Sequence, residues 1–383
     1  MCSSGAGFRV SGARVGFFFF ASCRQLCCRG ALVAPSIETL LLQRTKSGKM
    51  HNKVRLVQLN VKRFTDQHGQ STAEGIAEFL APLRPSLVAF NEVDTHSRPD
   101  AIKDISIRLG MHSEFFGHVR GRYGNVLLSK FPVLATAQHH LRGGTEWALP
   151  AGTKKFNGEI AKDGETHRIA RGMLCVDILI PPSPSPSDDT HCSGAGVGGA
   201  TEVGALAGVG MGMAGGRRVR VSVTHLDHIN EEQRRIQLSH IVEILHCGHG
   251  DEAVGGYADA DLLVGDMNAL TRQDYSDTQW CALEEEHRAN GWSAPVFGCL
   301  DILTQHSFVD CLLASREHVQ SQTENSIATC GGIYTTPAMA PRVRVDYCFA
   351  RGTGVGVHGA KVMRWEGGEP LSDHCAVVFD LTL

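Results

Sequence analysis

The chain has 383 residues, of which 42% are hydrophobic and 20% charged, enough for one large α/β domain or two modest ones. This composition excludes collagen-like, wholly disordered and disulfide-scaffold proteins. The formal net charge is −3, but residues 1–49 hold seven basic side chains and one acidic one. The rest carries 30 Lys and Arg against 39 Asp and Glu, a charge of −9, so it lacks the overall basic surface typical of proteins that depend on nucleic-acid backbone contacts.

We interpret residues 1–49 as an N-terminal leader. The apolar run VGFFFFAS at residues 15–22 is shorter than the roughly 20 residues that a membrane span needs, so no transmembrane span is predicted. The basic, acid-poor composition suits a mitochondrial or plastid transit peptide or a secretory signal. Alternatively Met50 is the true start and the leader is spurious, because MHNKVRLVQLN runs directly into a strand.

The 13 cysteines show no paired CxxC spacing, which argues against a disulfide framework or a structural zinc site. Several of them fall within apolar strand-like runs, where a free thiol behaves as a small hydrophobe. We therefore expect an intracellular protein, mitochondrial or plastid if residues 1–49 are a transit peptide and otherwise cytoplasmic. A monomer is expected.

Short apolar runs alternate with helical patterns after residue 50, which is typical of α/β proteins. The predicted strands are 53–60, 86–91, 125–129, 133–140, 168–180, 217–225, 261–266, 343–349, 357–364 and 375–382. Ten strands are too many for one simple doubly wound sheet, so we expect two packed sheets with helices outside. The predicted helices are 72–83 (capping box Ser71 and Glu74), 100–109 (ended by Gly110), 231–246 (capped by Asn230) and 277–290 (capped by Ser276).

The segment 181–216 begins PPSPSPSDD and continues as Gly, Ala and Val of low complexity. It cannot bury enough side-chain area to offset the entropy of ordering it, so we predict a disordered insertion between two antiparallel strands. The predicted organisation is a leader at 1–49 and one domain at 50–383 that carries this insertion.

Polar side chains gather at the ends of six predicted strands. They are Asn60, Glu92, His225, Asp266 with Asn268, Asp346, and Asp373 with His374. One such residue alone is explained by ordinary turn chemistry. Six strand ends of the same chemical kind indicate a shared site.

The residue types in this set suit the hydrolysis of a phosphate ester. Glu92, Asp373 and the carbonyl of Asn60 are hard oxygen ligands of the kind that Mg²⁺ prefers, with Mn²⁺ as the alternative. Asp266 can deprotonate a water molecule, and Asn268 can donate amide hydrogens to a phosphoryl oxygen that gains charge.

The two histidines of the set complete this chemistry. His374 can bind the phosphate as an imidazolium if Asp346 holds its other nitrogen, and His225 supplies a second imidazole. We therefore predict metal-assisted attack of water on a phosphate ester.

The ordered motifs QLN, NEV, GNVLLS, THLDH, GDMNA, RVDYCF and SDHCAVVFDL resemble the endonuclease/exonuclease/phosphatase superfamily, the deoxyribonuclease-I-like fold, over residues 53–383. The resemblance implies a four-layered α/β sandwich, with two mixed β-sheets packed face to face and helices on the outside. It also implies divalent-metal-dependent phosphoesterase activity. It assigns metal binding to Asn60, Glu92 and Asp373, catalysis to His225, Asp266, Asn268, Asp346 and His374, and substrate contact to Asn125.

Three positions depart from the pattern of many nucleic-acid-repair members. Leu59 replaces Trp before Asn60, Lys62 replaces an acid or amide after it, and Asn91 replaces the Gln before Glu92. The chain is most similar to the generic metal-dependent hydrolases of the superfamily.

The leading interpretation is a Mg²⁺-dependent phosphoesterase that hydrolyses a phosphodiester or phosphomonoester of a small molecule or a lipid head group. The alternative is a nuclease acting on DNA or RNA. A remote alternative is a non-catalytic binding module that keeps the fold. Such a module would lack one of Glu92, Asp266, Asn268 or His374, and the chain has all four.

Overall fold

A computed structural model of the chain describes residues 52–153, 159–182, 216–247, 257–291, 294–322, 333–365 and 369–383, without the side chains of 247 and 317–322. The chain divides into two units, Met1–Arg44 and Thr45–Leu383, and all described residues belong to the second. The predicted leader and the insertion between residues 183 and 215 lie outside the described residues. The domain boundaries therefore stay predictions.

The described residues form two mixed six-stranded sheets and a small hairpin. The first sheet has the order β13-β14-β1-β2-β4-β3, the second has the order β11-β12-β10-β9-β8-β5, and β6 pairs with β7. The first sheet comprises β1 (Lys53–Asn60), β2 (Leu87–Asp94), β3 (His112–Val119), β4 (Tyr123–Ser129), β13 (Gly356–Met363) and β14 (Ala376–Thr382). The second comprises β5 (Val133–His140), β8 (Gly172–Ile180), β9 (Arg217–His225), β10 (Ala260–Asp266), β11 (Val309–Asp310) and β12 (Asp346–Gly352), and the hairpin comprises β6 (Glu146–Ala148) and β7 (Thr166–Arg168).

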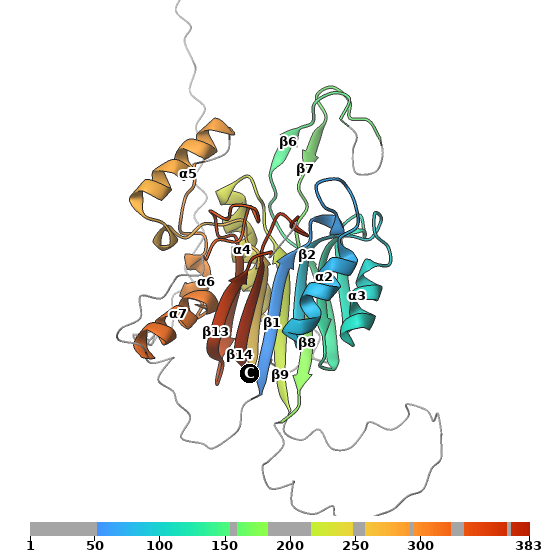
Figure 1. Cartoon of the computed structure of the whole chain (residues 1–383). Helices are drawn as coiled ribbons and strands as arrows, with labels where there is room; N and C mark the ends of the chain where they lie inside the picture. The colour runs from blue at the N-terminus through green and yellow to red at the C-terminus, as the bar shows by residue number, and fades with distance from the viewer. Residues whose placement is uncertain are drawn as a thin grey trace, which may run out of the picture. The chain divides into compact units, whose positions relative to one another are not determined.

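Helices cover the outer faces of the two sheets. The α-helices are α2 (Ala73–Leu80), α3 (Ala101–Leu109), α4 (Glu231–Cys247), α5 (Asp277–Ala289), α6 (Asp301–Gln305) and α7 (Cys311–Gln322), and short 3-10 turns cover Lys62–Phe64, Ala81–Leu83 and Arg272–Asp274. Figure 1 shows α2 and α3 beside one sheet, with the hairpin β6–β7 projecting beyond the strands. Within the described residues, no helix is long and apolar enough to cross a membrane.

The alternation of side chains along the strands builds three apolar layers. On β1, Leu56 points into a core shared by both sheets, whereas the next residue, Val57, packs with Ile76 and Leu80 of α2 on the outer side. On the other sheet, Leu263 of β10 packs with Ile241 of α4. Side chains of a strand point alternately to its two faces, so continuous apolar runs are buried on both sides. The predicted four-layered α/β sandwich is confirmed.

Most predicted elements are present, and several ends differ. The predicted cap of the first helix is wrong: the residue before the helix is Thr72, and it makes no side-chain capping bond. Ser71 instead forms a β-bridge with Thr65, which takes it out of capping position. The capping box at Ser276 with Gln279 is present, and Asn230 Oδ1 accepts from the backbone N–H of Glu232 at 2.8 Å.

The predicted strand 168–180 is two strands, β7 and β8, separated by residues 169–171. The chain crosses there from the hairpin to the second sheet, so an apolar pattern that looked continuous spans a change of direction. The pairing of β8 with β9 is antiparallel, as predicted. Strands β3, β6 and β11 and helices α6 and α7 were not predicted, because they are short, half-exposed or weakly periodic.

A buried cation holds the loop before β12 to the rest of the second sheet. Arg344 is fully buried, and its guanidinium forms ion pairs with Asp310 and, at 3.2 Å, with Asp274. The same group lies 4.1 Å from the ring centroid of Tyr347. Removal of one partner from such a network leaves uncompensated buried charge, which is far more destabilising than the loss of a surface pair.

We expect Arg344→Met to lower the free energy of unfolding by about 3–5 kcal/mol, because Asp274 and Asp310 would stay buried without a cation. The measurement is urea denaturation followed by circular dichroism. The control is Arg342→Met two residues away, whose ion pair with Glu286 is largely exposed, and which should change stability by no more than about 1 kcal/mol. Equal effects of both substitutions would contradict the structural role of Arg344.

Candidate active site

The strand directions bring the predicted site residues to one edge of the sandwich. β1 runs parallel to β2 and β9 parallel to β10, so their carboxyl ends lie together, whereas β14 and β12 run antiparallel to them and begin at that edge. The register places Asp266 directly between His225 and Asp346 on the neighbouring strands. Residues separated by up to 314 positions in the sequence therefore share one site.

Hydrogen bonds between the two sheets lock this edge together. Asn60 Nδ2 donates to Asp266 Oδ2 at 3.0 Å, and Gln58 Nε2 donates to Asp346 Oδ1 at 2.9 Å. The backbone N–H of Asp266 donates to Asn91 Oδ1 at 2.9 Å. Three polar residues of the first sheet thus position the two aspartates of the second.

His374 and Asp346 form a buried ion pair at the centre of the site. The Nδ1 of His374 lies 2.8 Å from Asp346 Oδ2, and its Nε2 lies 3.8 Å from Asp266 Oδ2. Burial alone would lower the pKa of His374, but the Asp346 carboxylate raises it to about 10. His374 is therefore an imidazolium at neutral pH, with Asp346 as the residue that orients it.

Asp266 is the buried carboxyl group beside this imidazolium. Burial, and then the negative charges of Asp346 and Glu92, raise its pKa above the ordinary value. A raised pKa gives a carboxylate more affinity for a proton, as a general base needs. Asn268 has a left-handed backbone (φ 47°), and its N–H donates to Asp266 Oδ1 at 3.0 Å, which fixes the carboxylate.

His225 is held in the opposite protonation state by Arg171. One guanidinium nitrogen of Arg171 donates to His225 Nδ1 at 3.2 Å and the other to His228 Nδ1 at 3.2 Å. Burial and the charge of Arg171 lower the pKa of His225 far below its usual value. Because Nδ1 accepts, the proton of neutral His225 is on Nε2, which lies 3.6 Å from Asp266 Oδ2.

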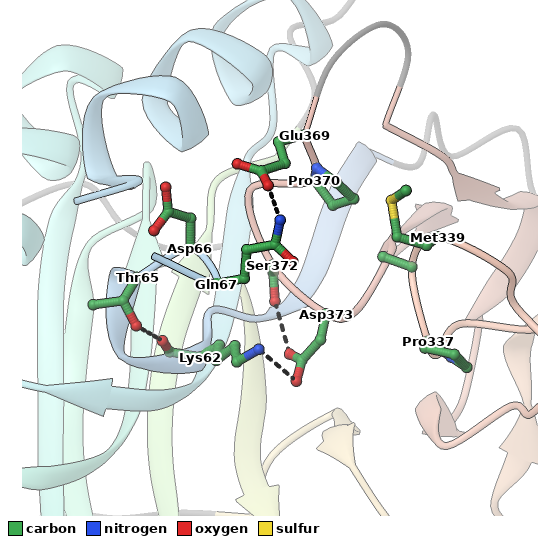
Figure 2. Close-up of a pocket in the computed structure, with 11 residues that line it drawn as sticks. Lys62, Thr65, Asp66, Gln67, Pro337, Met339, Glu369, Pro370, Ser372 and Asp373 are labelled. Atoms are coloured by element: carbon green, nitrogen blue, oxygen red, sulfur yellow. Dashed lines mark hydrogen bonds and ion pairs between the residues drawn. The ribbon is translucent and has the colours of Figure 1, made fainter. Parts of the chain in front are cut away.

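Hydrogen bonds join Asn60 to Glu92 and to Ser372, the residue before Asp373. Asn60 Nδ2 donates to Glu92 Oε1 at 3.1 Å, and the backbone carbonyl of Asn60 accepts from Ser372 Oγ at 2.6 Å. Figure 2 shows a neighbouring pocket that Lys62 and Asp373 line, where Lys62 Nζ lies 3.4 Å from Asp373 Oδ2. Glu92 has a left-handed backbone (φ 58°) at a bulge of β2, which turns its side chain into the cavity described below.

A second group of potential metal ligands lies close together at the site. One ligand atom from each of Asp266, Asp346 and His374 lies within 4.8 Å of the others. Both oxygens of Asp346 already accept hydrogen bonds, from Gln58 and His374, so this residue orients its neighbours. The accumulated carboxylate charge that raises the pKa of Asp266 fits a divalent cation on the Glu92 side.

Asn125, which the sequence resemblance assigned to substrate contact, lies beneath the site. Its side chain is fully buried, accepts from Asn91 Nδ2 at 2.9 Å and donates to the carbonyl of Gly172 at 2.9 Å. It does not line the cavity next to the catalytic carboxylate. We interpret Asn125 as a residue that positions Asn91, because its buried amide oxygen accepts from Asn91 Nδ2.

A cavity of about 450 Å³ opens beside Glu92 and Asp266. Its wall includes residues that were absent from the sequence prediction, namely Arg63, Tyr123, Trp147, His167, Arg171 and His228. Of these, Arg171 had a detectable signal, a charged residue inside the predicted apolar strand 168–180. His228 closes the THLDH motif, but it was not singled out in the sequence prediction. Arg63, Tyr123, Trp147 and His167 stood outside the predicted motifs.

A sequence profile of the Endonuclease/Exonuclease/phosphatase family matches residues 57–374, from within β1 to His374. The chain belongs to this family. A search of curated protein sequences found no match.

Solved structures of family members share the fold. The endonuclease/exonuclease/phosphatase from Bacteroides vulgatus superposes with a TM-score of 0.51 and 17% identity, covering 87% of this chain and 99% of its own. A family protein from Bacteroides thetaiotaomicron gives a TM-score of 0.51 and 12% identity, covering 87% and 98%. At these identities the likeness concerns the fold alone.

The loop after β9 is anchored by Asp227. This fully buried carboxylate accepts from the backbone N–H of Thr145 at 2.7 Å and from those of Ile229 and Asn230 at 2.9 Å each. Burial works against ionisation of Asp227, but these donors keep its pKa below the usual value. Asp227 thereby ties the β6–β7 hairpin to the loop that carries His228.

We expect Asp227→Asn to lower the free energy of unfolding at neutral pH by about 1.5–3 kcal/mol, because charge-assisted hydrogen bonds are lost. A carboxyl with a depressed pKa in the folded state stabilises above its unfolded pKa, and this stabilisation disappears as the pH falls through the folded value. The difference between wild type and variant should therefore shrink below about pH 4. Urea denaturation from pH 7 to pH 3 checks this, and a difference independent of pH would contradict it.

Proposed function

We propose that the chain is a divalent-metal-dependent phosphoesterase that hydrolyses a phosphodiester or phosphomonoester by attack of an activated water. The observation that carries the proposal is the place of Asp266 between two imidazoles of different charge. Its Oδ2 lies 3.8 Å from Nε2 of cationic His374 and 3.6 Å from Nε2 of neutral His225. A base beside a fixed cationic donor is what attack of water on a phosphate requires.

Glu92, Asn60 and Asp373 are the proposed metal ligands, with Mg²⁺ as the ion and Mn²⁺ as the alternative. Their oxygens are of the hard type that these ions prefer, and Asn60 already donates to Glu92 Oε1 at 3.1 Å. When bound, the ion would polarise a phosphoryl oxygen and offset the carboxylate charge.

The side chains of the site divide the reaction between them. Asp266 takes a proton from the water while the water oxygen forms a bond to phosphorus. The bond from phosphorus to the ester oxygen breaks, and the ester oxygen leaves with the electron pair of that bond. Negative charge grows on the phosphoryl oxygens, where the imidazolium of His374, the amide of Asn268 and the guanidinium of Arg171 donate hydrogen bonds. Their positions are set before substrate arrives, so no reorganisation accompanies the reaction.

A small substrate is favoured over a long nucleic acid. The chain after residue 49 carries a net charge of −9, which opposes binding of a polyanion along the surface. Nuclease activity on DNA or RNA is the alternative, since Arg63 and Arg171 line the cavity and are suited to contact the phosphates at the end of a nucleic-acid strand. A non-catalytic binding module has no support, because the proposed catalytic set is complete.

We expect purified full-length protein to hydrolyse bis(p-nitrophenyl) phosphate with Mg²⁺ or Mn²⁺, and EDTA to abolish the activity. His374→Ala and Asp346→Asn should each lower kcat by about 10²–10⁴, because each removes the imidazolium from the transition state. Release of p-nitrophenolate, with plasmid DNA and phosphomonoesters as further substrates, is the measurement.

The matched control is His246→Ala. The N-terminal end of the 17-residue helix α4 follows the loop that carries His228, and His246 is at the C-terminal end, so this variant should keep wild-type activity. Identical background rates for wild type and His374→Ala across the whole panel would contradict the proposed function. Activity that survives EDTA would contradict its metal dependence.

A further inference from the structure

The hairpin β6–β7 gives the cavity an aromatic wall. Trp147 of β6 lies directly opposite His167 of β7, with ring centroids 6.1 Å apart. Trp147 also meets the ring of His228 edge to face at 5.9 Å. All three rings line the cavity that contains Glu92 and Asp266.

This wall is connected to the proposed phosphate site through one histidine. His228 accepts at Nδ1 from Arg171, and the same guanidinium reaches His225, which adjoins Asp266. Arg171 is 5% exposed, its Nε has no hydrogen-bond partner, and among the described residues no carboxylate pairs with it. A buried cation that forms no ion pair within the described part of the chain therefore lies between the catalytic carboxylate and the aromatic wall, where it can bind an anion.

The hairpin is held in place without a ligand. Thr145, next to β6, donates its N–H and its hydroxyl to Asp227, at 2.7 and 2.9 Å. Gly144 N–H donates to Gln233 Oε1 of α4 at 2.8 Å, and Ile169 N–H donates to the carbonyl of Thr145 at 3.0 Å. Because these bonds fix the base of the hairpin, where β6 begins and β7 ends, Trp147 is positioned before binding and little ordering entropy is lost there.

We propose that Trp147, with His167 and His228, binds a planar nitrogen-containing ring, such as a nucleobase, attached to the phosphate group that Arg171 holds. The proposal rests on the proposed function, since it names the substrate class of that site. The cavity wall combines aromatic rings with the cations Arg63 and Arg171. The rings suit stacking with a base, and the cations suit pairing with a phosphate group. An acyl chain would instead cover imidazole and guanidinium nitrogens without satisfying them.

The size and charge of the protein point to a nucleotide-sized ligand. The cavity volume of about 450 Å³ fits one small molecule, and the acidic charge of the chain opposes a long polyanion. The expected substrate is a small phosphoester that bears one base or a similar flat heterocycle.

The experiment compares two probes that differ by the base. Binding of adenosine monophosphate, ribose 5-phosphate and hexyl phosphate to the full chain is measured by calorimetry in EDTA, which suppresses metal-dependent turnover. Adenosine monophosphate should bind roughly fivefold to a hundredfold more tightly than ribose 5-phosphate, the range expected from stacking of one base. Trp147→Leu should bring this ratio near one, and Trp147→Phe should keep most of it.

The control is Trp280→Phe on α5, whose ring meets Tyr275 edge to face at 5.8 Å, does not line the cavity, and should not change the ratio when replaced. Equal affinity of wild type for the two probes, an unchanged ratio in Trp147→Leu, or tighter binding of hexyl phosphate than of adenosine monophosphate would each overturn the proposal. A preserved ratio in a protein that hydrolyses no phosphoester would instead overturn the proposed function and leave the ring site standing.

Discussion

Two sheets that pack face to face bury their inner surfaces, so every polar group placed there needs a hydrogen-bond partner. In this protein three amide side chains of the first sheet, Gln58, Asn91 and Asn125, are fully buried near the edge that carries the site. Their amides bond to Asp346, to the backbone of Asp266 and to the carbonyl of Gly172, all from the second sheet. A buried amide without these partners would be destabilising by about 1–3 kcal/mol, so the polar edge fixes how the sheets meet. The site exists because both sheets contribute to it at this fixed register.

The electrostatics of the site follow from the same arrangement. Asp346 is close enough to His374 to keep it charged in a buried position, whereas Arg171 is close enough to His225 to keep it neutral. Two imidazoles therefore flank Asp266 in different states, although neither is exposed to solvent. His118 shows the same influence of Arg171, since burial and this cation lower its pKa to about 3. A low-dielectric environment makes these short-range partners decisive.

The outer part of the cavity is built differently from its floor. The floor consists of strand ends whose backbone bonds are satisfied within the sheets, and it carries the carboxylates and imidazoles. The wall is the β6–β7 hairpin, which pairs with neither large sheet and is attached through Asp227 and Gln233. Such a separation lets the residues that contact the rest of the substrate vary without disturbing the reacting centre. In this proposal Trp147 contributes to substrate specificity, whereas Asp266 takes part in the reaction itself.

Most of the long elements and the chemical types of the site residues could be predicted from the sequence. Apolar runs located β1 and β9 to the residue, since side chains buried on both faces leave little ambiguity, and the ends of the half-exposed edge strand β5 were also predicted correctly. Polar residues at strand ends identified Asn60, Glu92, Asp266 and His374 as members of one site, because strand direction brings such ends together. Short or half-exposed strands such as β3 and the hairpin were missed, because a few residues of mixed polarity carry no readable period.

Which of these residues touch, and which protonation states their histidines take, depends on how the two sheets pack. The pairing of Arg171 with both His225 and His228 depends on the crossing from β7 to β8, which in the sequence looked like a single strand. Asn125 matched a substrate-contacting position by motif, but packing between the sheets placed it underneath the site. Periodicity reports which face of a strand is buried, whereas distances across two sheets depend on packing and on buried polar contacts that no local pattern encodes.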